Sequence, residues 1–95
     1  MDDSPWPFDQ PPNSRSVTLL SILVEREPIL LVCHLREDDR WLFFPGGDFT
    51  AEDGALVSLS TIVAHDPTVR EVADLPPGWI ARRDDAKSEW KRRPA

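Results

Sequence analysis

Apolar and polar residues alternate most clearly in residues 28–44, PILLVCHLREDDRWLFF. In the first run the alternating sets are Ile29, Leu31, Cys33, Leu35 and Leu30, Val32, His34, Arg36. In the second run Trp41 and Phe43 alternate with Leu42 and Phe44, as side chains of an extended chain do. Residues 37–39, Glu-Asp-Asp, separate the two apolar runs and suit a turn, because short Asp side chains hydrogen-bond the backbone of a turn. The pattern predicts a β-hairpin around which the rest of the chain is organised.

The segment before this hairpin, residues 16–27, has a pattern that fits a helix. Its apolar residues fall at helical spacing, on Leu19, Leu20, Leu23 and Val24. Ser16 is suited to cap the start of a helix, although the Val, Thr and Ile of the segment also suit a strand. We expect a short helix that ends before Pro28, because proline has no backbone donor with which to continue it.

Three further elements follow the hairpin. The Pro-Gly-Gly run within residues 45–54 predicts a turn, since glycine adopts positive φ without steric cost. Residues 56–65 predict a short helix with Ser58 as its cap, and residues 68–75 predict a second helical turn that ends before two prolines. Residues 78–83, GWIARR, alternate and predict a third strand.

These elements indicate an α+β fold, with a small antiparallel sheet built on the central hairpin and two or three short helices. At 95 residues the chain is long enough for one modest core. We assign residues 16–90 to a single α+β domain, residues 1–15 to a flexible, proline-rich acidic tail, and residues 91–95 to a basic C-terminal tail. Trp6 and Phe8, in the first tail, are suited to docking on the domain or on a partner, and the simpler alternative is a tail with one loosely docked aromatic.

Composition narrows the class of protein. The single cysteine excludes an internal disulfide, and no apolar run is long enough to cross a bilayer, so we expect a cytoplasmic protein without a membrane contact. A net charge of −6 argues against nucleic acid as the main ligand, because phosphate binding needs clustered Lys and Arg.

The charge is distributed unevenly along the chain. Residues 37–53 hold six acidic residues and one basic residue, whereas residues 79–95 hold six basic residues and three acidic residues. An acidic loop beside an aromatic hairpin would attract a basic protein partner. We therefore predict a partner-binding surface at Asp48, Glu52 and Asp53, where the closest bases in sequence are Arg40 and Arg70.

Catalytic and metal-binding patterns are weak. Residues 41–54, which begin WLFFPGG, are similar to the W-x-x-PGG lead of Nudix hydrolases, but the Arg-Glu pair and the carboxylates that would hold Mg²⁺ are missing at the required spacing. Cys33 and His34 are neighbours on a strand, so their side chains point to opposite faces. We predict no catalytic residues, no metal and no cofactor. The alternative is a small enzyme or ligand-binding domain with a pocket near His65, Asp66 and Arg82.

The order of motifs resembles a family of small bacterial proteins related to immunity-protein-like domains of unknown function. The motifs are PILLVCH, DDRWLFFPGGD, VSLSTIVAHDPTVREVADLPPGW, ARR and a final EW, and they cover Val17 to about Trp90. The matching positions are Trp41, Phe43, Gly47, Asp48, Leu59, Ile62, Asp66, Pro67, Pro76, Gly78 and Arg82. The resemblance implies an α+β fold and a non-catalytic, protein-binding role in which the chain neutralises a toxin partner.

Overall fold

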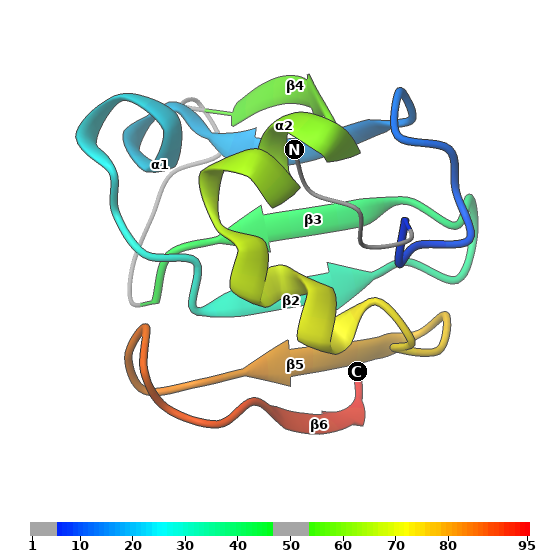
Figure 1. The fold of residues 1–95 in the computed structure, drawn as a ribbon. Coiled ribbons are helices and arrows are strands. Elements are labelled where there is room, and N and C mark those ends of the chain that lie inside the picture. The colour runs from blue at the N-terminus through cyan, green and yellow to red at the C-terminus, as the bar shows by residue number, and fades with distance from the viewer. Residues whose placement is uncertain (1–5, 47–53) are drawn as a thin grey trace.

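The computed structural model describes residues 6–46 and 54–95, and these form an α+β fold with a single six-stranded sheet. The strand order is β4-β1-β3-β2-β5-β6 (Figure 1). β1 and β3 pair in parallel and the other neighbours pair antiparallel. The elements in chain order are β1 (Arg15–Leu19), α1 (Leu20–Glu25), β2 (Leu31–His34), β3 (Trp41–Phe44), β4 (Gly54–Ser58), α2 (Leu59–His65), the 3₁₀ helix η2 (Pro67–Val72), β5 (Trp79–Arg82) and β6 (Lys91–Pro94).

The predicted hairpin is confirmed at the centre of the sheet. β2 and β3 pair antiparallel, with Leu31 opposite Phe44 and His34 opposite Trp41. Leu35 N–H donates to the carbonyl of Arg40 at 2.8 Å, and Asp39 takes a positive φ of 59° between them. A short Asp side chain tolerates this left-handed conformation better than most residues, so the acidic segment closes the turn.

One face of the sheet is covered by α2 and η2, which lie across β1, β3 and β2 (Figure 1). Trp41, Phe43 and Val32 point into this layer and are buried. From the helices they meet a matching set of apolar side chains, Leu59, Ile62, Val63, Val69 and Val72. The core therefore lies between the helices and the face of the hairpin that carries Trp41 and Phe43, and the two side chains share one face as their spacing predicts.

Side-chain caps fix the positions of these two helices. The Ser58 hydroxyl accepts a hydrogen bond from Thr61 N–H at 3.3 Å, which confirms the predicted cap of α2. Asp66 then caps η2 by accepting from Thr68 N–H at 3.1 Å, and Pro67 occupies the first turn, where its missing donor costs nothing.

The prediction of one helix over residues 16–27 is wrong for its first part, which forms β1. Val17 pairs with Leu42 of β3 and with Leu56 of β4, so β1 lies between two strands that come later in the chain. The buried Thr18 hydroxyl donates to the Phe43 carbonyl at 2.9 Å. This pairing outweighs the helical spacing of the leucines, and the helix begins only at Leu20, beyond the sheet.

Both predicted tails contribute to the fold. Phe8 is buried against Trp41, and the carbonyls of Pro12 and Ser14 each accept a backbone hydrogen bond at 2.9 Å from the first turn of α2. Residues 91–94 pair with β5 as the edge strand β6. Residues 6–15 and 91–95 therefore belong to the fold, and their assignment to tails is wrong. Phe8 and the β5 edge supply contacts that composition does not reveal.

Candidate functional site

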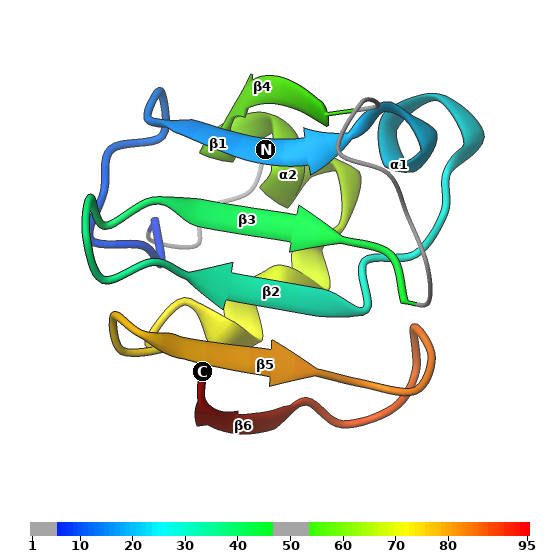
Figure 2. The same cartoon turned by 180° about the vertical axis from the view of Figure 1, so that it is seen from behind.

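The second face of the sheet is not covered by any described helix; we call it the open face. Figure 2 shows this face, with β1, β3, β2 and β5 in front and α2 and η2 behind them. Because side chains alternate along a strand, every residue next to a core-facing one points to the open face. The surface follows directly from the register of the strands.

An apolar row crosses the open face from strand to strand. Register pairs join Leu56 to Val17, Val17 to Leu42, Leu42 to Cys33 and Cys33 to Ile80. Leu56 is 59% exposed, and the other four are partly exposed. Adjacent strands lie about 5 Å apart, so side chains opposite one another are in contact. The row forms a continuous apolar surface on a domain whose other face is already packed.

A shallow hollow lies on this surface. It has a volume of about 460 Å³, and its lining includes Cys33, Leu42 and Ile80 of the row, Trp79 and Ala95 from the β5–β6 side, and the charged Arg36 and Glu37 after β2. The hollow gives the apolar row a concave region, which a protruding side chain of a partner could fill.

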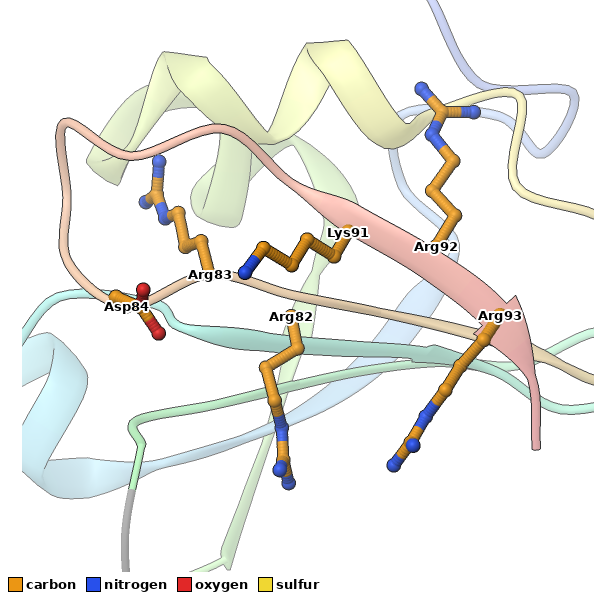
Figure 3. Close-up of a pocket in the computed structure, with 6 residues that line it drawn as sticks. All are labelled: Arg82, Arg83, Asp84, Lys91, Arg92 and Arg93. Carbon is orange, nitrogen blue, oxygen red and sulfur yellow. The ribbon is translucent and has the colours of Figure 1, made fainter.

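A basic cluster, defined here as Arg82, Lys91 and Arg93, flanks the apolar row at the β5–β6 side of the sheet. Arg82 lies opposite Lys91, and Arg93 lies opposite Ile80. These residues line a pocket of about 260 Å³ together with Arg83, Asp84 and Arg92 (Figure 3). In Figure 3, Arg82 and Arg93 extend away from the helices, whereas Arg83 and Arg92 extend towards them.

The cysteine at the centre of the row has a perturbed thiol. Burial raises the pKa of Cys33 above its ordinary value, and the nearby positive charge of Arg82 acts in the opposite direction. Since the thiolate is the reactive form, Cys33 is held mostly as the less reactive thiol at neutral pH.

We expect the rate of Cys33 alkylation by iodoacetamide to rise with a pH midpoint above that of an ordinary free thiol. Arg82→Gln should move the midpoint higher still, because it removes a charge that favours the thiolate. Lys87→Gln is the control and should leave the midpoint unchanged. A midpoint at or below the ordinary value, measured by mass spectrometry across a pH series, would contradict the buried environment.

The alternative pocket near His65, Asp66 and Arg82 is not assembled as the sequence suggested. Asp66 pairs with the adjacent arginine, with Arg83 Nη2 3.0 Å from Asp66 Oδ2, on the helix side of the sheet. Arg82 extends to the open face instead (Figure 3). Consecutive residues of an extended chain point to opposite sides, so only one of the two arginines can reach Asp66.

The predicted partner-binding residues Asp48, Glu52 and Asp53 lie outside the described residues, so that assignment stays a prediction. Within residues 6–46 and 54–95, no group of three or more His, Cys, Asp or Glu residues is placed to hold a metal ion. Over the same residues, the helices are all too short or too polar to cross a bilayer.

Comparisons with protein-family models, with curated proteins and with solved structures found no match to the chain. The fold and the surface define a small two-layer α+β domain in which none of the described helices covers the second face of the sheet. Sequence reasoning noted the positive charge of residues 79–95 but did not assign the basic cluster to a surface. The two-residue spacing of Ile80 and Arg82 in the predicted third strand could have placed these two side chains on one face, whereas Lys91 and Arg93 join them only through the pairing of β6 with β5.

Proposed function

We propose that this chain is a non-catalytic protein-binding module that holds its partner on the open face of the sheet. The observation that carries the proposal is the partly exposed apolar row, which runs over β4, β1, β3, β2 and β5 opposite a fully packed face. Sheets in globular domains usually bury their apolar faces against a second layer, and a contiguous exposed apolar surface is typical of an interaction site.

The proposal of a non-catalytic role is supported by the contacts of two candidate acid–base groups, His34 and Asp66. His34 is buried, its Nδ1–H donates to the Leu75 carbonyl at 2.7 Å, and its Nε2 lies 3.0 Å from Asp39 Oδ1. Asp66 caps η2 and pairs with Arg83. Groups with these structural partners are poorly placed to act as an acid or a base towards a substrate.

The resemblance to immunity-protein-like domains extends the proposal to the kind of partner. In this proposal the chain binds a toxin in the cytoplasm and neutralises it by occupying its surface. The competing proposal, a small enzyme or ligand-binding domain that uses His65, Asp66 and Arg82, has less support, because Asp66 pairs with Arg83 and Arg82 extends to the open face.

The test compares two pairs of aliphatic-to-threonine substitutions in a pull-down from native lysate at low salt. Leu42→Thr with Ile80→Thr removes the centre of the apolar row while keeping a residue that favours strands. Leu20→Thr with Val24→Thr is the control, since these α1 side chains are 50% and 75% exposed and lie off the sheet. We expect a protein that the wild type and the α1 pair retain and the sheet pair loses.

Circular dichroism on each variant checks that the fold is kept. Equal retention by the sheet pair and the wild type would contradict the proposal. So would loss of the partner in the α1 pair alone, which would place the interface on α1.

A further inference from the structure

The charged side chains of the strands all carry the same sign of charge. The charged residues of the six strands are all basic, Arg15, Arg82, Lys91, Arg92 and Arg93, although the chain as a whole has a net charge of −6. By strand alternation, all of these except Arg92 occupy open-face positions. The acidic residues of the described chain lie in helices and loops, and of these Glu37 reaches the lining of the hollow beside Arg36. The β5–β6 side of the open face is therefore a positive surface on a negative protein.

The positive charges of the basic cluster are not neutralised by ion pairs within the described part of the chain. Other arginines nearby have partners: Arg92 Nη1 lies 2.6 Å from Asp74 Oδ1, and Arg83 pairs with Asp66. Arg82, Lys91 and Arg93 have no ion pair with any residue in the described part of the chain. Placing like charges together on adjacent strands is unfavourable in the free protein, so a ligand that neutralises them gains affinity.

We propose that the partner of the open face is an acidic protein surface, with an apolar centre and carboxylates along one side. The inference rests on the function proposed above and names the chemistry of its partner. Carboxylates would meet the basic cluster, where each guanidinium can donate two parallel hydrogen bonds. Apolar side chains would meet Leu42, Cys33 and Ile80. The basic partner expected from Asp48, Glu52 and Asp53 would require a different surface.

A second copy of this chain is a poorer occupant than an acidic protein. Two open faces in contact would bring positive charge against positive charge, because the strands of the described sheet contain no acidic residue. Like charges placed across an interface repel one another and select against that pairing.

Single-stranded nucleic acid is also a poorer occupant. Proteins that bind it stack successive bases on exposed aromatic side chains, whereas the row across this face is made of Leu, Val, Cys and Ile, and Trp79, which lines the hollow beside it, is only partly exposed. The net charge of −6 would moreover repel a long polyanion. An aliphatic centre beside an arginine-rich side fits an amphipathic acidic segment of a protein.

The test uses a synthetic amphipathic peptide with leucine on one side and glutamate on the other, a lysine counterpart, and a single-stranded oligonucleotide. Binding to the full chain is measured by fluorescence anisotropy at two ionic strengths. Protection of Cys33 from alkylation reports contact at the centre of the face. We expect the glutamate peptide to bind, to slow alkylation of Cys33, and to weaken as salt increases.

Charge reversal provides the matched comparison. Arg82→Glu with Arg93→Glu should slow association of the glutamate peptide about tenfold or more at low salt. Arg26→Glu with Lys87→Glu changes the net charge equally at exposed residues outside the strands, and should change the rate less than about twofold. Equal effects of the two pairs would overturn the inference, as would tighter binding of the lysine peptide or the oligonucleotide.

The two proposals can fail separately. If the protein captured in the pull-down binds the Arg82→Glu, Arg93→Glu variant as well as the wild type, the acidic partner is wrong and the protein-binding role stands. If the threonine pair on the sheet leaves that capture unchanged, the protein-binding role of the open face itself is wrong.

Discussion

Replacement of Arg83 by methionine should lower the free energy of unfolding by about 3–5 kcal/mol, the usual cost of removing one partner from a buried ion pair. Arg83 is only 4% exposed, and its Nη2 lies 3.0 Å from Asp66 Oδ2. The guanidinium also lies over the Trp90 ring at 4.2 Å. Methionine keeps part of the apolar volume but leaves the Asp66 carboxylate without its cation.

The same substitution also removes hydrogen bonds that join distant parts of the chain. Arg83 Nε donates to the Ile29 carbonyl at 2.9 Å, and Nη1 donates to the Thr68 hydroxyl at 3.0 Å and to the Ala86 carbonyl at 3.2 Å. One side chain therefore connects the start of the hairpin, η2 and the β5–β6 loop. Its loss leaves the buried Ile29 carbonyl without a donor, which is costly, and also removes two part-buried hydrogen bonds.

The control for this prediction is the neighbouring arginine. Arg82→Met should change the unfolding free energy by less than about 0.5 kcal/mol, because Arg82 is exposed. Urea denaturation of both variants measures the difference. Similar losses in the two variants would show that Arg83 does not hold the fold as its contacts indicate.

Trp41→Ala is the second substitution with a large expected effect, about 3–5 kcal/mol of unfolding free energy. Trp41 is 2% exposed, stacks on His34 with ring centroids 4.0 Å apart, and meets the Phe8 ring edge to face at 4.9 Å. Its Nε1–H donates to Gln10 Oε1 at 2.8 Å. A domain of this size has only about 5–15 kcal/mol in total, so the variant should lose a large share of its stability.

Trp41→Phe separates the ring from the hydrogen bond. It keeps an aromatic ring against His34 and Phe8 and loses the donor to Gln10, so it should cost distinctly less than alanine, with about 1 kcal/mol from the hydrogen bond. Thermal and urea denaturation give both values. A loss below about 1 kcal/mol for Trp41→Ala would mean that the tryptophan does not anchor the core.

Local sequence patterns predicted an element correctly where the interactions that stabilise it join residues close in sequence. The hairpin needs only two alternating runs and an acidic turn, and the start of α2 needs only Ser58 three residues before Thr61. The same holds for β5, whose alternation around Ala81 is visible in the sequence. In each case the residues that make the hydrogen bonds or the buried face lie within the element itself.

Prediction failed where distant residues decide the structure. The segment with the helical stripe becomes β1 because β3 and β4 offer pairing on both of its sides. Lys91–Pro94 has no apolar alternation and is a strand only because β5 has an unpaired edge. For Asp66, the sequence could not indicate whether Arg82 or Arg83 would reach it, because that choice depends on which face of β5 meets η2.

The position of β1 has a consequence for the order of folding. The β2–β3 and β5–β6 pairs join strands that are consecutive in the chain, and such hairpins form within microseconds. β1 must instead close a loop to β3, as in the contact of Thr18 with Phe43 across 25 residues, and then accept β4 on its other side. Because closing long loops is slow, insertion of the first strand between two later ones should limit the folding rate, with the N-terminal strand docking last onto a preformed hairpin.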